Sequence, residues 1–505
     1  MSATLQPPEG PDLGAAAVHG VRWTAMARGT VEVVLMASMI LLARLISPAE
    51  FGYFAVAIIA QELAIVITAE GIGTALVQRA TVGREHLQAG LWLALATGLV
   101  LTVVSLVAAS LIVAPLFGAR TAEFVRLSSP LFLIAAAGTV PMALLRRRLA
   151  FRRLSMIDVG TSIMRVGVAV ALAIAGMEGE SLVFGGIAAG LTTTVMAWAS
   201  APAPWPRLRL QAAREVMSYG LPASIASISW VGFRNCDYAI ISARLGAVQA
   251  GYYFRAYMLA VEYQKKISIV MGQVGLPLLA RSGAGMAAMR GQMVRLLAIL
   301  TFPLLGVLAI TAPVLVPWLF GSEWAPTVVP MQILAVGGAS TLIIDAVGVT
   351  LMASGRPRAL LGFGFGHFGV YAAAVLIATP FGLSGVAAAA AIVHTAFLGV
   401  AYVLMVRGTD ERPLRSLWAD VGPAVVASLG LVAVAAPASI ALSAANTPTF
   451  VQLVIVTLAA FAAYALTLRL TFPAAWAEIV MLASRVLPSP PSVPRPRRRP
   501  VEVSP

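Results

Sequence analysis

The stretch RNCDYAIISARLGAVQAGYYFRAYML, residues 234–259, decides the fold because it joins two apolar segments through a tight polar turn and places charged residues within them. A weaker copy, ARLISPAEFGYFAVA, occupies residues 43–57. Both copies contain Ala-Arg-Leu, then a short turn, and then Gly-Tyr-aromatic at the start of the next predicted helix. In a membrane protein, a repeat of this kind predicts two structural halves.

The composition is that of a polytopic membrane protein. Of the 505 residues, 59% are hydrophobic and only 11% are charged, with a mean hydropathy of +0.89, whereas a soluble domain carries about 25% charged residues. The net charge of +14 would also suit a nucleic-acid-binding protein. The basic residues cluster in short loops between apolar segments, as membrane topology requires, so we expect no nucleic-acid partner. The single cysteine, Cys236, excludes a disulfide scaffold.

The apolar residues form fourteen runs long enough to cross a membrane as a helix, which takes about 20 residues. Backbone polar groups in lipid must be satisfied within the chain, and the short alternating segments of a large barrel are absent, so the predicted fold class is all-α. The runs lie near residues 21–44, 51–76, 89–117, 127–146, 155–177, 181–201, 216–242, 251–279, 293–320, 326–353, 359–380, 383–406, 418–442 and 449–472.

These runs group as six, six and two, which divides the chain into predicted regions. We expect two pseudo-symmetric six-helix lobes around a central cavity, at 19–201 and 216–406, followed by two more spanning helices at 418–472. The remaining regions are predicted to be cytoplasmic, and the last of them opens with a candidate interfacial helix. They are an N-terminal tail at 1–18, a linker at 202–215, a loop at 407–417 and a basic, proline-rich tail at 473–505.

Loop charges set the predicted orientation. With the N-terminus in the cytoplasm, the inner loops carry 18 arginines and the outer loops carry 4, so both termini are predicted to be cytoplasmic. Because both halves begin on the same side, the repeat predicts a parallel relation about an axis along the membrane normal. The alignment matches Arg44 with Arg244, Gly52 with Gly251 and, if no gap intervenes, Glu62 with Glu262.

Ionisable residues inside the predicted spans concentrate in the first two helices of each half. Each costs about 2.5–3.5 kcal/mol at the membrane centre on insertion scales, so each needs a partner, a cavity or a function. One interpretation is neutralisation within pairs such as Arg28–Glu32 and Glu262–Lys265. We favour the other, a polar cavity, in which arginine suits a diphosphate and a desolvated glutamate suits ion coupling.

No sequence pattern predicts an enzyme or a cofactor. GFGFGHFG at 362–369 has no preceding strand, so Gly362 and Gly366 are predicted to pack a helix face rather than to bind a nucleotide. His367 and His394 lack a second metal ligand at helical spacing and are predicted to be packed or hydrogen-bonded. Without a P-loop, a Ser-His-Asp order or a zinc motif, we expect no cofactor, no metal and no ATP hydrolysis.

Three motifs together resemble a known family. LARLISPAEFGYFAVA at 42–57 is similar to the N-terminal signature of Wzx-like bacterial polysaccharide-export flippases, in the colanic-acid and teichuronic-acid exporter branch. LFGSEWAPTVVPMQILA at 319–335 resembles their loop between helices nine and ten. The similarity extends over about residues 18–472. Their middle motif is matched by Asn235, Asp237, Leu245, Gly246, Gly251, Tyr252, Tyr253, Ala256 and Tyr257.

That resemblance implies membership of the multidrug/oligosaccharidyl-lipid/polysaccharide exporter superfamily, whose members have two six-helix lobes, often with two extra helices, and work by alternating access. The implied substrate is an undecaprenyl-diphosphate-linked oligosaccharide, moved from the cytoplasmic to the periplasmic leaflet of the bacterial inner membrane. The other implied partners are membrane lipids and the polysaccharide polymerase and export machinery.

The resemblance also implies site residues. Arg22, Arg28 and Arg255 are similar in placement to the cavity arginines of the lipid II flippase branch, and they are expected to bind the diphosphate. A basic residue expected in the second helix is missing, with Tyr53 or Phe54 near that place, so the match is partial. The residues expected to balance charge or couple ions are Glu32, Glu62, Glu70, Asp237, Glu262 and Lys265.

Two other functions stay open at this point. A cation-coupled small-molecule antiporter of the same superfamily would be favoured by a net acidic cavity and a small cationic substrate. A non-transporting membrane scaffold for glycan assembly would tolerate the loss of every cavity charge but would need its cytoplasmic loops. Drug resistance, glycan levels and loop deletions would discriminate among the three.

Overall fold

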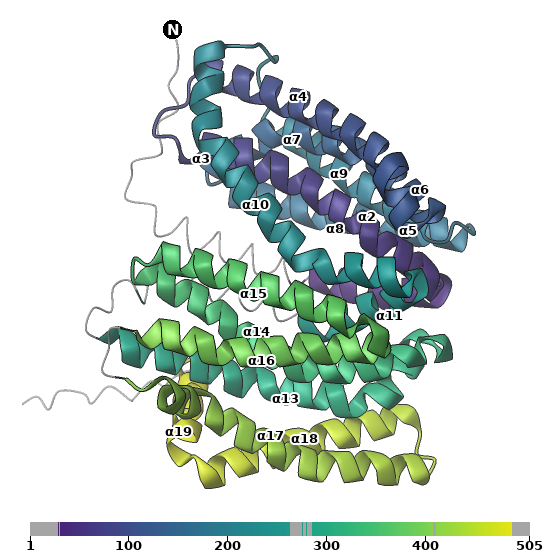
Figure 1. Cartoon of the computed structure of the whole chain (residues 1–505), viewed down its shortest axis with the longest axis vertical. Coiled ribbons are helices and arrows are strands. Elements are labelled where there is room, and N and C mark those ends of the chain that lie inside the picture. Colours follow the sequence, from purple (N-terminus) through teal and green to yellow (C-terminus); the bar gives the residue numbers. More distant parts are fainter. Residues whose placement is uncertain are drawn as a thin grey trace, which may run out of the picture. The chain divides into compact units, whose positions relative to one another are not determined.

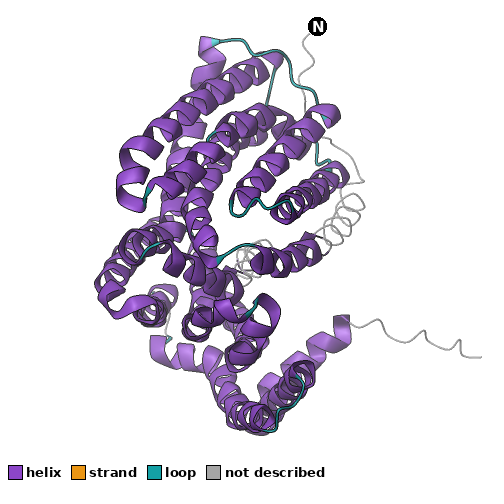
Figure 2. Cartoon of the chain, turned by 90° about the vertical axis from the view of Figure 1, so that its right-hand side faces the viewer, coloured by secondary structure: helices purple, strands orange, loops and turns teal. Residues whose placement is uncertain are grey.

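A computed structural model of the chain describes residues 31–262, 285–407 and 411–486, together with Gly29, Gly275 and Leu279. Throughout these ranges the regular elements are helices, which confirms the all-α prediction (Figures 1 and 2). After a helical segment at 31–45, the elements are α2 (Pro48–Val66), η1 (Ile67–Gly73), α3 (Thr74–Gln78), α4 (Arg84–Ala108), η2 (Ala109–Val113), α5 (Ala114–Phe117), α6 (Ala119–Ser128), α7 (Pro130–Arg147), α8 (Phe151–Ile174), α9 (Glu180–Ser200), α10 (Leu210–Leu245), α11 (Ala247–Tyr257), η3 (Met258–Glu262), α13 (Met286–Phe320), η5 (Ser322–Thr327), α14 (Val328–Ala353), α15 (Pro357–Ala378), η6 (Thr379–Phe381), α16 (Gly382–Val406), α17 (Pro413–Ala444), α18 (Thr449–Thr471) and α19 (Pro473–Val486).

Ten helical stretches of the described chain are long and apolar enough to cross a membrane. Large apolar side chains on them are exposed, as lipid contact requires: Val100 is 59% exposed and Leu111 is 72% exposed on the stretch that begins with α4. The chain is therefore a multi-pass membrane protein. The count of fourteen spans stays a prediction, since the expected span at 251–279 lies largely outside the described residues.

The helices form two compact units, each described here by itself. The first contains the residues up to 266 together with 312–338 and 361–397, and the second contains 267–311, 339–360 and the residues from 398 onward.

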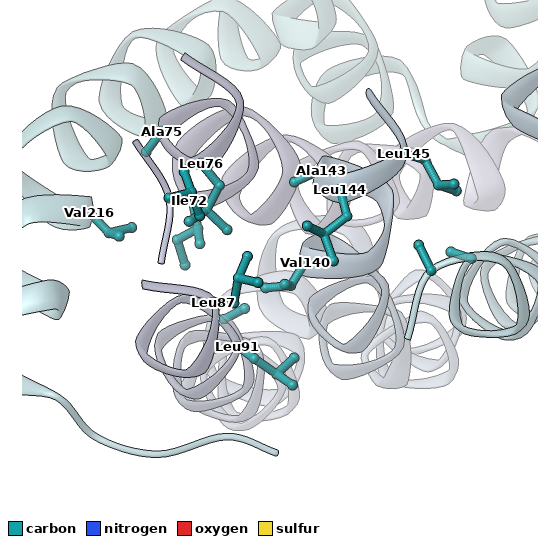
Figure 3. Packing of buried hydrophobic residues seen from close by; sticks show 14 of the residues in the cluster. Ile72, Ala75, Leu76, Leu87, Leu91, Val140, Ala143, Leu144, Leu145 and Val216 are labelled. Carbon is teal, nitrogen blue, oxygen red and sulfur yellow. The ribbon is translucent and has the colours of Figure 1, made fainter. Parts of the chain in front are cut away.

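In the first unit, apolar side chains from several helical segments form one large buried cluster (Figure 3). Ile72 and Leu76 come from η1 and α3, Leu91 comes from α4, and Val140 comes from α7. Val216, near the start of α10, belongs to the same cluster and is fully buried. The beginning of α10 is therefore packed onto the helices that precede it in the chain.

The two copies of the sequence repeat pack directly against each other through α2 and α11. A Cβ atom at Gly52 would overlap the carbonyl oxygen of Ala247, and a Cβ atom at Gly251 would overlap the carbonyl oxygen of Pro48. The contact is reciprocal, because the two glycines match in the repeat and so do the two residues that they touch. Only glycine permits such a close approach of two helix backbones.

Gly246 separates α10 from α11 with a φ of 87°, a left-handed conformation that glycine adopts without the steric cost that other residues incur. The sharp turn brings α11 back beside α10. The polar end of α10 and the start of α11 therefore lie close together, as the turn in the sequence predicts.

In the second unit, α17 and α18 form a close antiparallel pair and α19 follows α18 (Figure 1). The Tyr464 hydroxyl of α18 donates a hydrogen bond to the carbonyl oxygen of Ile299 on α13, at 3.1 Å. Arg290 of α13 pairs with Glu411 at 2.5 Å. The hydrogen bonds that the Glu411 carboxylate accepts from Ser416 and Arg290 outweigh its burial and lower its pKa below the usual range.

The reciprocal glycine contact predicts a large difference between two Gly→Ala substitutions. Gly52→Ala drives a methyl group into a backbone carbonyl that cannot rotate away, so we expect a loss of stability of at least about 2 kcal/mol. Gly167→Ala in α8 meets no atom within 4 Å and should stabilise that helix by roughly 0.5–1 kcal/mol. Thermal unfolding in detergent measures both, and equal melting temperatures for the two variants would contradict the close contact.

Candidate functional site

The candidate site lies where α10 meets α2 and the segment formed by α11 and η3. α10 is 36 residues long, and its second half carries the polar run that begins at Arg234. A pocket in the first unit opens among these elements, with about 20 Å³ of space for water, enough for roughly one water molecule. Its lining is formed by Ile58, Glu62, Arg234, Asn235, Tyr238, Phe254, Tyr257, Met258 and Glu262.

Two polar contacts organise the pocket. The Asn235 amide Nδ2 donates to the Glu62 carboxylate at 2.9 Å and also to the carbonyl oxygen of Val231 at 2.9 Å. The Arg234 guanidinium pairs with the Glu262 carboxylate at 3.4 Å, and both side chains are about one third exposed. Two carboxylates thus share the pocket with one arginine, which gives the lining a net negative charge when both carboxylates are ionised.

The turn before α11 is one residue shorter than the turn before α2. Arg44 matches Arg244 at the end of the preceding helices, whereas Gly52 matches Gly251 after the turn. If both following helices were regular, the later residues of α11 would therefore be displaced by one position relative to those of α2.

The π-helix η3 compensates for this displacement. A regular helix would place Val261 at the position that matches Glu62, but η3 spans Met258–Glu262 and holds one extra residue in its turn. Glu262 then matches Glu62, and both glutamates line the same pocket. The pairing inferred from the repeat therefore coincides with a meeting of the two side chains at one site.

Asp237 lies about one helical turn beyond Arg234 on α10, and it is 1% exposed. Its carboxylate accepts hydrogen bonds from the hydroxyls of Tyr253, at 3.0 Å, and Tyr371, at 2.9 Å, and from the backbone N–H of Tyr238, at 2.9 Å. These donors come from α10, α11 and α15, so Asp237 holds three helices of the first unit together.

The two histidines of α15 and α16 lie beyond Tyr371. The His367 and His394 rings meet edge to face with their centroids 5.0 Å apart, and His394 Nδ1 lies 2.6 Å from the carbonyl oxygen of Ala390. The His367 ring also stacks on Phe363. His367 is thus packed among rings of the first unit and His394 is also hydrogen-bonded, in agreement with the prediction that each is packed or hydrogen-bonded.

The structure places Arg255 among aromatic rings. Its guanidinium carbon lies 4.3 Å from the ring centroid of Phe51, 4.9 Å from that of Trp324 and 5.1 Å from that of Phe320. The residue is 2% exposed, and its Nη1 atom donates to the carbonyl oxygen of Met39 at 3.4 Å. The predicted contact between Arg255 and a diphosphate stays a prediction, and in this conformation the guanidinium binds protein groups.

The remaining predicted site residues either lie outside the described part of the chain or do not line the pocket. Arg22, Arg28 and Lys265 lie outside the described residues, as does the side chain of Glu70. Glu32 lies in the helical segment at 31–45, is half-buried and does not line the pocket. Of the nine predicted residues, the structure therefore brings together Glu62 and Glu262 in the pocket, with Asp237 nearby on α10.

An ion-pair cluster near the start of α2 was not predicted from the sequence. Arg120 of α6 pairs with Glu50 at 3.2 Å, with Glu123 at 3.0 Å and with Glu180 at 2.5 Å. The backbone N–H of Gly179 also donates to Glu50, at 3.2 Å. A signal was present in the sequence: Glu178 and Glu180 give one loop between apolar runs an acidic character, and Arg120 lies in another such loop on the same predicted side.

A second cluster ties the start of α10 to the preceding helices. Glu215 accepts from the Nε2 of His86 at 3.0 Å and pairs with Arg79 at 2.5 Å. The hydrogen bond from His86, together with the charge of Arg79, lowers the pKa of Glu215 below its usual value. Because the backbone N–H of Gly83 donates to His86 Nδ1 at 3.2 Å, the neutral imidazole carries its proton on Nε2.

The aromatic surroundings of Arg255 predict that lysine cannot replace it. Lysine keeps the charge but lacks the planar face that packs on three rings, so Arg255→Lys should lower stability by roughly 2 kcal/mol. Arg244→Lys, at the exposed position that precedes the turn, should leave the melting temperature unchanged. Thermal unfolding of the two purified variants makes the comparison, and a fully stable Arg255→Lys protein would show that the rings contribute little.

Comparison with known proteins places these features in a family context. The chain is 23% identical over 369 residues to the teichuronic acid biosynthesis protein TuaB of Bacillus subtilis, covering 72% of this chain and 76% of that protein. It is 24% identical over 360 residues to the lipopolysaccharide biosynthesis protein WzxC of Escherichia coli, covering 70% and 73%.

Solved structures share the fold. The lipid II flippase MurJ, in an inward closed conformation, matches with a TM-score of 0.71 and 12% identity over 89% of this chain and 98% of its own. An inward-facing multidrug resistance transporter of the MATE family and the MOP superfamily matches with a TM-score of 0.61 and 14% identity over 74% and 93%. At these identities the likeness concerns the fold alone.

A family model described as "Polysaccharide biosynthesis protein" matches residues 41–329. The matched region contains both copies of the repeat, the reciprocal glycine contact and every residue that lines the pocket. Because this match extends over more than half of the sequence, the chain belongs to the polysaccharide biosynthesis protein family.

Proposed function

We propose that this chain is a flippase, which moves an undecaprenyl-diphosphate-linked oligosaccharide from the cytoplasmic to the periplasmic leaflet of the bacterial inner membrane. Family membership and the names of the relatives support a role in surface polysaccharide synthesis. The observation that carries the proposal is the pocket, which two matching glutamates from different copies of the repeat line. Ionisable residues within a membrane are costly and commonly mark the path of a substrate or an ion.

The size of the pocket favours ion coupling over direct sugar binding. About 20 Å³ holds one water molecule or a small cation but no sugar ring. Two carboxylates and one arginine leave room for a bound cation or proton, and its binding would change how Glu62 and Glu262 interact with α10. In this proposal Glu32, Glu70, Asp237 and Lys265 complete the charge balance of the cavity or take part in coupling.

Arg22, Arg28 and Arg255 are the proposed ligands of the diphosphate. The planar guanidinium donates two parallel hydrogen bonds, which match a pair of phosphate oxygens. Of the three, Arg255 lies within the described residues, and three aromatic rings surround it there. Its direct contact with phosphate would require these rings to move during the transport cycle.

The proposed topology has fourteen spans in the order six, six and two, with both termini in the cytoplasm. Two six-helix lobes would enclose a central cavity and expose it to each side in turn. The reciprocal contact between α2 and α11 supports this arrangement, because it joins the two copies of the repeat in the manner expected of pseudo-symmetric halves.

Deletion of the gene tests the proposal. We expect surface polysaccharide to be lost while undecaprenyl-linked repeat units accumulate on the cytoplasmic side, since flipping is the step between their synthesis and polymerisation. Unchanged polysaccharide together with altered drug resistance would favour a small-molecule antiporter. Export that survives loss of every cavity charge, but fails when cytoplasmic loops are deleted, would favour a scaffold.

The pocket residues make a sharper prediction in the complemented deletion strain. Glu62→Gln and Glu262→Gln keep the side-chain shape but remove a charge, and each should reduce export by roughly tenfold or more, equivalent to about 1.4 kcal/mol in the barrier. Glu123→Gln removes an exposed carboxylate outside the pocket and serves as the matched control. Full export by both pocket variants, at normal expression, would exclude a coupling role for these glutamates.

A companion experiment addresses the diphosphate. Arg28→Ala alone and the double variant Arg28→Ala/Arg255→Ala are compared for export and for protein level in the membrane. A double variant that is normally expressed and fully active would overturn the phosphate assignment.

A further inference from the structure

The last described helix, α19, has an unusual distribution of polarity. It follows the spanning helix α18 after a single residue, Phe472, at which the backbone leaves the helical conformation with φ −134° and ψ 67°. Its first residues therefore follow directly on a helix that is long and apolar enough to cross a membrane. Because only Phe472 separates the two helices, the backbone bend at this residue sets the direction of α19 relative to α18.

The acidic residue of α19, Glu478, packs against another helix of the second unit. The Glu478 carboxylate pairs with Arg295 of α13 at 3.5 Å and is 18% exposed. Arg295 also lies 3.8 Å from Asp420 of α17, so it joins α19 to the helices of the second unit. Ala475, on the same side of α19, is 4% exposed.

The opposite side of α19 is exposed and apolar. Val480 is 49% exposed and Met481 is 53% exposed, and Ala474 and Ala477 are exposed beside them. From Pro473 to Met481 the single charged residue is Glu478. This is the reverse of a water-facing helix, which buries its apolar side and exposes its charges.

The lipid surface is the occupant that fits this face. α19 begins where a spanning helix ends, and an apolar face at that depth contacts the boundary between head groups and acyl chains. The sequence beyond Met481 adds Arg485, Arg495, Arg497, Arg498 and Arg499 against one acidic residue, Glu502. A cluster of arginines beside the membrane attracts anionic phospholipid head groups.

We propose that α19 lies in the interfacial layer with its exposed face against lipid, and that the arginines that follow it give this end of the protein a preference for anionic phospholipid. The inference rests on α19 and the sequence after it, and it is independent of whether the chain transports a lipid-linked oligosaccharide. It assigns the C-terminal region to membrane binding rather than to the transport pathway.

Lipid quenching of a single fluorescent label tests the placement of α19. In the full-length protein with Cys236→Ser, a cysteine replaces Met481 and, as a water-exposed control, Glu85 at the start of α4. Each variant is labelled with an environment-sensitive dye and reconstituted into vesicles that contain brominated phosphatidylcholine. We expect strong quenching at position 481 and little at position 85. A label at 481 that is quenched only by aqueous iodide, or is shielded from both quenchers by protein, would overturn the proposal.

The head-group preference is measured with the same label at position 481. Brominated phosphatidylglycerol is compared with brominated phosphatidylcholine, and the ratio of quenching gives the relative association of the two lipids. Each arginine near the surface contributes roughly fivefold, so the wild-type tail should favour the anionic lipid several-fold. Replacing Arg495, Arg497, Arg498 and Arg499 with glutamine should bring the ratio close to one. Equal quenching by the two lipids with the natural tail would refute the role of the arginines.

Discussion

The close approach of two glycines is the constraint on which the rest of the described site depends. Gly52 and Gly251 let the backbones of α2 and α11 touch, so the two repeats share one contact instead of being separated by side chains. Glu62 lies 10 residues beyond Gly52, and Glu262 lies 11 residues beyond Gly251, at the end of η3. Any side chain at the crossing would push the helices apart, and the pocket further along would open by a comparable amount.

Much of this arrangement could be predicted from the sequence, because matching positions in the two copies of the repeat are expected at equivalent places in the two structural halves. Hydropathy identified the helices, and the match between Glu62 and Glu262 indicated which glutamates would meet. The partners of buried charges could not be found in this way. Phe51, Trp324 and Phe320 surround Arg255, and Tyr371 donates to Asp237, across long intervals of sequence that carry no periodic signal. A hydropathy pattern does not distinguish an arginine that packs among aromatic rings from an arginine that is exposed to a phosphate.

The polar groups of the first unit are of two kinds, which differ in how fully hydrogen bonds and aromatic rings enclose them. Asp237 accepts three hydrogen bonds and Arg255 faces three rings, so changing the charge of either would disturb several helices at once. The pocket glutamates are less deeply buried: Glu62 accepts from the Asn235 amide, and Glu262 is a half-buried partner of Arg234. Groups of the second kind can change partners at a small cost in free energy, which is what ion coupling would require. The boundaries of the two lobes and the identity of the diphosphate ligands stay predictions.

The contact between Trp324 and Ala43 has a consequence for the synthesis of the chain. The indole Nε1 donates to the Ala43 carbonyl oxygen at 2.8 Å across 281 residues, and Arg44 donates to the carbonyl oxygens of Trp318 and Leu319. Bacterial chains grow at about 5–20 residues per second. The first hairpin therefore enters the membrane and waits many seconds before the residues that complete its hydrogen bonds leave the ribosome. Arg255 is synthesised after Phe51 but before Phe320 and Trp324, so two of the three rings that surround its guanidinium join it only in the last part of that interval.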